Sequence, residues 1–278
     1  MRPQAGGRRS RPTPWPIDGA VMLRWLALAA LGAAVMLVER RRPARRYVEA
    51  RAVHTGRNLA MAGIAAATVQ LLEAPIVARV ARTVARRRWG LLHHVGGPAW
   101  ARDVAAVLLL DYTLYLWHVL VHRVPWLWRF HLVHHVDLDL DVSTGLRFHA
   151  GELAASVPWR AAQVAVIGVS PRALALWQTL TLASVTFHHS NIRLSDQTER
   201  RLAWLVATPR MHAIHHSVNP VQLQSNFSSG LAVWDWLHRT ARFDADAADV
   251  QVGVEGYLDP DAVSLPRLLR LPLERRPD

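Results

Sequence analysis

The sequence has no cysteine and no lysine. Without cysteine the chain cannot form disulfides, thiolate zinc sites or a cysteine nucleophile. Without lysine all 33 basic residues are arginine. Together with abundant alanine and leucine, this composition indicates a GC-rich, bacterial genome.

The arginines give the chain a formal net charge of +12 at pH 7. Such a charge is compatible with nucleic-acid binding. These arginines, however, cluster beside apolar segments, where arginine is a typical flank of membrane helices. We therefore expect a membrane as the partner and no nucleic acid.

Five apolar segments predict an all-α fold, an integral membrane helical bundle. They comprise residues 21–38, 59–78, 104–121, 153–169 and 173–187. A full crossing needs roughly 20 apolar residues, so the last two segments, joined by a short turn, predict a tight helical hairpin near the lower length limit. Arginines directly after the first segment favour a retained membrane helix over a cleaved signal peptide.

Composition divides the chain into four parts. Residues 1–16 are rich in arginine, proline and glycine, and we expect them to be disordered. Residues 17–102 contain membrane helices and basic loops, and residues 103–240 contain most of the histidines. Residues 241–278 form a C-terminal tail, and no second folded domain is expected.

Histidines are concentrated in motifs with helical spacing. Eight of the 15 fall into one H-x-x-x-H and two H-x-x-H-H motifs: His118 and His122; His131, His134 and His135; His212, His215 and His216. Residues three and four apart on a helix share a face, so each motif clusters its imidazoles. Neutral imidazole suits iron, zinc and copper, and eight such ligands are enough for two metal ions.

Two other protein classes also use histidine clusters. A membrane zinc hydrolase would need a general base, usually within H-E-x-x-H, and that motif is absent; eight histidines also exceed one zinc site. A non-enzymatic metal-binding or transport protein would place its ligands near the bilayer midplane. The motifs of this chain follow the ends of apolar segments instead.

With their flanking residues, the motifs resemble the sterol desaturase / fatty acid hydroxylase superfamily of membrane histidine-box di-iron enzymes. The resemblance covers about residues 88–240. Its blocks occur in family order: Asp111, Tyr115, Trp117, His118 and His122; Leu127, Trp128, His131, His134 and His135; Arg147, Phe148, His149 and Glu152; Phe187, His189, Ser190 and Asn191; Thr208, Pro209, Arg210, His212, His215, His216 and Ser217; Asn226 and Phe227; Trp234 and Asp235. The chain departs from the family pattern at Ala150, Ser228 and His238, which affects the expected substrate pocket more than the metal ligands.

The resemblance implies a set of metal ligands in a catalytic domain at residues 103–240. These ligands are His118, His122, His131, His134, His135, His189, His212, His215 and His216. His149, Asp111 and Asn191 are supporting residues or possible ligands. Asp111 either accepts a hydrogen bond from a ligand imidazole or is a satisfied intramembrane carboxylate. His188 is expected on the face opposite to His189.

The resemblance also implies an activity: an O2-dependent oxidoreductase that hydroxylates or desaturates a lipid, such as a sterol or a fatty acyl chain. Two non-haem iron ions would carry the chemistry, and zinc can substitute in purified protein. The chain has no cysteine for an iron–sulfur cluster and no haem domain. We therefore expect an external electron donor, a ferredoxin or a cytochrome b5-like protein.

The predicted topology places all histidine motifs at one membrane surface, in a cytoplasmic, histidine-rich helical cap that holds a di-metal site. The third apolar segment ends at that surface, and the hairpin of the fourth and fifth segments returns to it. Seven arginines between positions 40 and 57 favour the cytoplasmic face of a bacterial inner membrane. Five arginines between positions 79 and 88 lie on the opposite side and argue against this orientation.

Overall fold

The computed structural model describes residues 19–274. These residues form helices, connecting loops and three isolated β-bridges, and they contain no β-strand. The predicted all-α fold is thereby confirmed. The disorder predicted for residues 1–16 concerns a segment outside the described residues.

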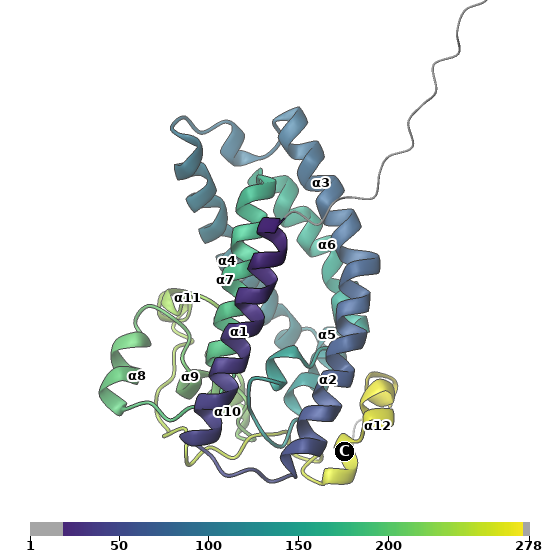
Figure 1. The fold of residues 1–278 in the computed structure, drawn as a ribbon, viewed down its shortest axis with the longest axis vertical. Helices are drawn as coiled ribbons and strands as arrows, with labels where there is room; N and C mark the ends of the chain where they lie inside the picture. The colour runs from purple at the N-terminus through teal and green to yellow at the C-terminus, as the bar shows by residue number, and fades with distance from the viewer. Residues whose placement is uncertain (1–18, 275–278) are drawn as a thin grey trace, which may run out of the picture.

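Five long helical segments run along the long axis of the molecule (Figure 1). They are α1 (Gly19–Arg41), the continuous α2 (Arg51–Thr68), η1 (Val69–Glu73) and α3 (Ala74–Arg87), then α4 (Ala99–Arg123), α6 (Ala150–Ile167) and α7 (Pro171–His188). Three stretches are long and apolar enough to cross a membrane: Met22–Arg41, Arg51–His93 and Ala99–Arg123. Many of their large apolar side chains are exposed, as expected for a lipid-facing surface.

Helices α6 and α7 form the predicted hairpin. Gly168 ends α6 in the left-handed conformation, and the hydroxyl of Ser170 caps α7 by accepting a hydrogen bond from the amide of Ala173. A side chain at Gly90 would collide with the backbone of Gly168, because its Cβ would lie 2.3 Å from the Gly168 nitrogen. The turn is therefore held close to the loop that follows α3.

The remaining helices are short, and all but η2 (Leu91–His93), which follows α3, gather in the lower part of the bundle in Figure 1. These are α5 (Pro125–His135), η3 (Thr144–Leu146), α8 (Asp196–Leu202), α9 (Pro209–His215), α10 (Pro220–Leu223), α11 (Val233–His238), η4 (Pro260–Val263), α12 (Leu265–Arg270) and η5 (Leu271–Leu273). The basic loop after α1 lies at the same end, because the amide of Ala44 donates to the carbonyl of Asn191. The histidine motifs and this basic loop therefore share one end of the bundle.

The two largest apolar cores hold the bundle and its cap, which consists of the short helices and loops at the lower end. One lies between α3, α4, α6 and α7, and it includes Leu110, Val164 and Trp177. The second joins α5 to Met61 of α2 and to the chain after residue 256, including Leu268. Residues 241–274 are therefore an integral part of the cap, packed against the elements that carry the histidines.

The π-helical turn η1 interrupts the second long helix beside its proline. Pro75 has no amide proton, so the carbonyl four residues earlier loses its α-helical partner. Such a bulge lets the helix continue while it changes the direction of nearby side chains, and π-turns are frequent at functional sites. Here the turn places the carboxylate of Glu73 inside the bundle, where it is 8% exposed.

Candidate metal centre

Nine buried histidines meet at the lower end of the bundle in two adjacent groups. The first group has five members: His118, His122, His131, His135 and His215. The second group has four members: His134, His189, His212 and His216. Within each group one ring nitrogen per residue lies within 4.8 Å of all the others. The structure thus brings together all nine histidines that the resemblance implied as ligands.

Each H-x-x-H-H motif contributes to both groups. His131 and His135 enter the first group, whereas His134 enters the second. On an α-helix, positions i and i+4 lie about 40° apart around the axis and position i+3 lies about 60° to the other side. Each triplet therefore points two rings at one group and one ring at its neighbour. The rings of His135 and His216 stack across the boundary at a centroid distance of 4.2 Å.

Backbone carbonyls fix the orientation of several rings. In the first group, Nδ1 of His118 lies 2.6 Å from the carbonyl of Phe227, and Nδ1 of His215 lies 2.7 Å from the carbonyl of Ser225. Because a carbonyl oxygen only accepts, each Nδ1 must carry the proton. The Nε2 atom of each ring is then left with a lone pair, which is the arrangement of a metal-ligating histidine.

The second group repeats this arrangement. Nδ1 of His134 lies 3.2 Å from the carbonyl of Arg147, and Nδ1 of His189 lies 3.0 Å from the carbonyl of Val185. The Nε2 atoms of these two histidines are 3.2 Å apart. The Nε2 atoms of His118 and His215 in the first group are 3.1 Å apart.

Facing lone pairs at this distance repel each other unless a cation lies between them. Burial holds the pKa values of His134 and His215 well below the usual histidine range, so protonation does not supply that cation. Two nitrogens about 2.1 Å from one metal ion and at right angles to each other are about 3.0 Å apart. The donor chemistry and the nitrogen–nitrogen distances therefore fit one metal ion in each group.

Glu152 supports the first group. Its Oε1 atom lies 3.0 Å from Nδ1 of His131, and its side chain is buried near the start of α6. A carboxylate in this position fixes the tautomer and orientation of a ligand imidazole. Glu152 belonged to the sequence blocks but not to the predicted site, because its contact with His131 depends on the packing of α6 against α5.

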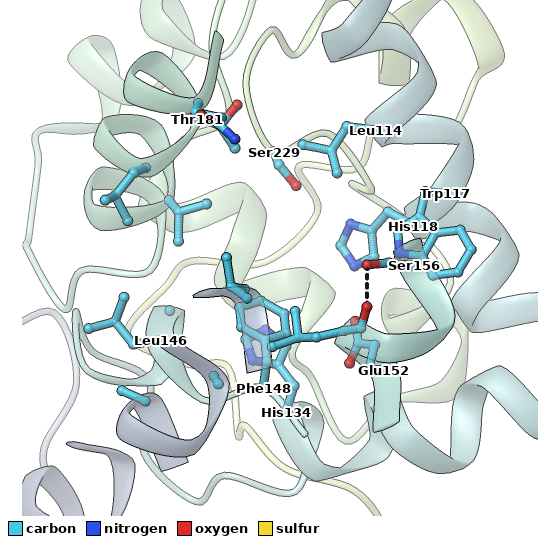
Figure 2. A pocket seen from close by; sticks show the side chains of 18 of the residues that line it. Leu114, Trp117, His118, His134, Leu146, Phe148, Glu152, Ser156, Thr181 and Ser229 are labelled. Carbon is cyan, nitrogen blue, oxygen red and sulfur yellow. Dashed lines mark hydrogen bonds between the residues drawn. The ribbon is translucent and has the colours of Figure 1, made fainter. Parts of the chain in front are cut away.

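An apolar cavity of about 440 Å³ opens directly onto both groups. Six histidines form one end of it: His118, His131, His134, His188, His189 and His212. Figure 2 shows His118 and His134 around the same space as Leu114, Trp117, Leu146 and Phe148. An apolar space beside a polar metal-binding group is typical of a site for a largely apolar ligand.

Comparison with known proteins shows which family has this architecture. The family model described as fatty acid hydroxylase matches residues 103–240. The chain belongs to the fatty acid hydroxylase family. No solved structure matches it.

Several relatives within the family share the matched region. The chain is 27% identical to ornithine lipid hydroxylase OlsE of Rhizobium tropici over 154 residues, which are 55% of this chain and 45% of the relative. It is 32% identical to a cholesterol 25-hydroxylase-like protein of Danio rerio over 153 residues, 51% and 56% of the two chains. It is 25% identical to alkylglycerol monooxygenase of Xenopus tropicalis over 131 residues, 47% and 28% of the two chains. The matches thus cover about half or less of the length of these relatives.

The three supporting residues implied by the family resemblance all lie outside the two histidine groups. Asp111 accepts hydrogen bonds from the amide of Leu231 and from Nε1 of Trp234, at 3.0 and 2.7 Å. Within residues 19–274 it has no hydrogen bond to a histidine, and its two donors match the second interpretation of the sequence, a satisfied carboxylate. Its role is to hold the loop that follows Phe227, and Gly230 leaves room for the carboxylate there.

His149 and Asn191 also have structural partners. His149 is the N-cap of α6: its Nδ1 accepts from the amide of Gly151 at 2.9 Å, and its Nε2 lies 3.3 Å from the carbonyl of Leu269. Both ring nitrogens are therefore engaged away from the histidine groups. The side chain of Asn191 pairs with the amide and the carbonyl of Arg45 and so ties the basic loop to the end of α7.

His188 differs from its prediction. It was expected on the face opposite to His189, yet its ring lies 4.6 Å from the ring of His189 and 4.3 Å from that of His212. The side chain is buried and lines the cavity. The reason is packing: neighbours on a helix lie only about 100° apart around its axis, and α9, which carries His212, packs against α7. Neither ring nitrogen of His188 has a hydrogen-bond partner in the described part of the chain.

Two further residues of the sequence blocks hold the first group in place. Asn226 adopts a left-handed conformation with φ of 53°, and its side chain donates to the carbonyls of Met211 and Arg242. The carboxylate of Asp235 accepts from the amides of Phe227 and Ser228. Together they fix the loop whose Phe227 carbonyl orients His118. These hydrogen bonds join residues that are separated in the chain, so the spacing of the sequence motifs does not reveal them.

Proposed function

We propose that the chain is a membrane-bound di-iron oxygenase that hydroxylates a lipid with O2 and external electrons. One observation carries the proposal: two adjacent groups of convergent histidine nitrogens open onto an apolar cavity in a bundle with apolar, exposed helices. The relatives named hydroxylases and monooxygenases support insertion of oxygen. Desaturation of the same kind of chain is the alternative outcome.

The overall reaction balances with one external reductant. A C–H bond of the lipid is replaced by C–OH, the second oxygen atom of O2 leaves as water, and two electrons and two protons are consumed. Iron held by the two histidine groups would supply the activation of O2. The chain itself supplies the ligand geometry, through the Phe227 and Arg147 carbonyls and Glu152, and an apolar wall that keeps water from the reacting carbon.

The electrons must come from another protein in this proposal. A ferredoxin or a cytochrome b5-like donor would reach the histidine end of the bundle, where the arginine-rich stretch at residues 40–57 also lies. Such a basic surface accelerates the approach of an acidic partner. We propose that this end faces the cytoplasm of a bacterial cell. A reporter fused after Asp278 should then register a cytoplasmic terminus, and a periplasmic signal would overturn the orientation.

Metal content and oxygen labelling test the proposed function together. The chain purified without chelator from iron-replete cells should contain about two irons, because imidazole-only sites suit iron. Lipids from cells that express it under isotopically labelled O2 should carry one labelled oxygen per product. A His134→Ala variant is the matched inactive control. One zinc without iron, and no labelled lipid, would instead support a zinc hydrolase; zinc in both sites would show metal substitution during expression.

A further inference from the structure

We propose that the cavity has a second, polar subsite that is set back from the metal centre along α6. Given the proposed lipid oxygenation, we infer that this subsite binds an uncharged, oxygen-containing group of the lipid, such as a hydroxyl, ester or amide group. Its residues are Glu73, Ser156, Arg160 and Trp177. By anchoring that group it would determine which carbon of the lipid lies at the histidines.

Helix α6 runs from the histidine end of the cavity to its polar subsite. Glu152, Ser156 and Arg160 recur every fourth residue on one face of this helix, and all three line the cavity. Glu152 contacts His131, whereas Arg160 lies eight residues further along, a distance of about 12 Å at 1.5 Å per residue. Helix α7 parallels this run from His189 at the metal end to Trp177 at the subsite.

The polar groups of the subsite lie close to one another, and most of the remaining cavity wall is apolar. Nε of Arg160 lies 3.5 Å from the Glu73 carboxylate, and the Ser156 hydroxyl lies 3.4 Å from the same carboxylate. The Arg160 guanidinium also lies over the ring of Trp177, 4.7 Å from its centroid. Ionisable residues among membrane helices are costly to bury and commonly mark a functional site.

Three hydrogen-bond donors of this cluster are buried without an acceptor. Nε and Nη1 of Arg160 and Nε1 of Trp177 have no hydrogen-bond partner among residues 19–274. Both side chains line the cavity, and the Trp177 side chain is only 4% exposed. Buried donors are normally satisfied, so an oxygen atom of a bound ligand is the partner that this geometry accommodates.

The charges of Glu73 and Arg160 indicate which kind of oxygen-containing group the subsite binds. The Glu73 carboxylate offsets the positive charge of Arg160, so the pair is neutral as a unit. A carboxylate or phosphate ligand would meet Arg160 together with a like charge on Glu73. An uncharged acceptor can instead use the free N–H groups without disturbing the pair, and a ligand hydroxyl can also donate to Glu73.

Equilibrium binding to the full chain in detergent micelles tests the subsite. The probes are radiolabelled hexadecanol, hexadecane and hexadecanoate, which share one chain length. We expect hexadecanol to bind about tenfold more tightly than hexadecane, as one or two satisfied hydrogen bonds would give. Trp177→Phe removes one donor and keeps an aromatic ring. The double variant Glu73→Leu with Arg160→Met removes the Arg160 donors and the Glu73 acceptor and leaves the net charge unchanged.

Both variants should lose the preference for hexadecanol while hexadecane binding stays the same. Gln163→Met is the matched control, because Gln163 is buried on the same helix but donates to Thr113 and does not line the cavity. An unchanged preference in both variants, or none in the wild type, overturns the proposal. Tighter binding of hexadecanoate than of hexadecanol overturns the uncharged class. The assay needs no turnover, so failure of the proposed oxygenation would be seen separately, as absence of labelled lipid.

Discussion

Nδ1 of His131 lies 3.0 Å from Oε1 of Glu152, and this pair links the first histidine group to the wall of the cavity. The second carboxylate oxygen has no hydrogen-bond partner in the described part of the chain. A carboxylate that accepts from Nδ1 leaves Nε2 of His131 free to bind a metal. Glu152 is therefore placed to determine how His131 presents its nitrogen.

Replacing Glu152 should weaken the first group without unfolding the chain. We expect Glu152→Ala to lower activity or metal affinity by about 10–100-fold, the usual effect of losing a partner of a ligand histidine. Glu152→Gln should lose less, because its amide oxygen still accepts from Nδ1. Metal content per chain and labelled-lipid formation measure the effect. Asp103→Asn, at the hairpin end of the bundle, is the control. Wild-type metal content and activity in Glu152→Ala would contradict this role.

His134 and His188 should respond differently to the same substitution. Both are buried near the second group, but only His134 directs Nε2 at another member, His189. We expect His134→Ala to lose metal because it removes a ligand. His188→Ala should keep the metal content of the wild type, because its ring lies beside the group. Elemental analysis of the two purified variants decides the matter, and metal loss in His188→Ala would make it a tenth ligand.

His149→Ala tests whether this histidine is a helix cap. Loss of the contact from Nδ1 to the amide of Gly151 should lower the free energy of unfolding by about 1 kcal/mol. Thermal unfolding of the solubilised chain measures this change, and His149→Asn should restore most of it, because asparagine is a favoured cap. Metal content should remain that of the wild type. A variant that is stable but has lost metal would show that His149 takes part in metal binding.

The sequence predicted those parts of the site that depend on local spacing. Eight of the nine histidines could be identified from helical spacing, whereas His189 followed only from the family resemblance. The hairpin could be predicted from two short apolar segments and the glycine and proline between them. Residues 241–274 could not be assigned to the core, because Leu268 and its neighbours pack against α2 and α5, which are distant in sequence.

The contacts that orient the histidine rings could not be predicted from the spacing of residues in the sequence. Glu152 contacts His131 across 21 positions, and the Phe227 carbonyl reaches His118 across 109. The position of His188 depended on the packing of α9 against α7, two helices that are separated in the sequence. The polar subsite of the cavity depended on the π-turn that directs Glu73 inward toward Arg160.

A buried ionic cluster behind the second group connects His134 to α2. Asp137 pairs with Nη1 of Arg147 at 2.9 Å and with Nε2 of His54 at 3.0 Å, and all three are almost fully buried. The carbonyl of Arg147 in turn orients His134. His54, outside the sequence blocks and outside both histidine groups, thus supports the site indirectly. Breaking such a buried pair on one side usually costs about 3–5 kcal/mol.

The pH dependence of stability should reveal this cluster. Burial alone would raise the pKa of Asp137, but Arg147 and His54 hold it well below the usual range. A depressed carboxyl pKa contributes stability above the unfolded value of about 3.9, and that stability is lost as the pH falls below it. The metal-free chain should therefore lose helical circular dichroism as the pH falls through this window. Asp137→Asn should be less stable at neutral pH and show a flatter dependence there, whereas the exposed Asp249→Asn should follow the wild type. Parallel curves for Asp137→Asn and the wild type would show that Asp137 is not the group responsible.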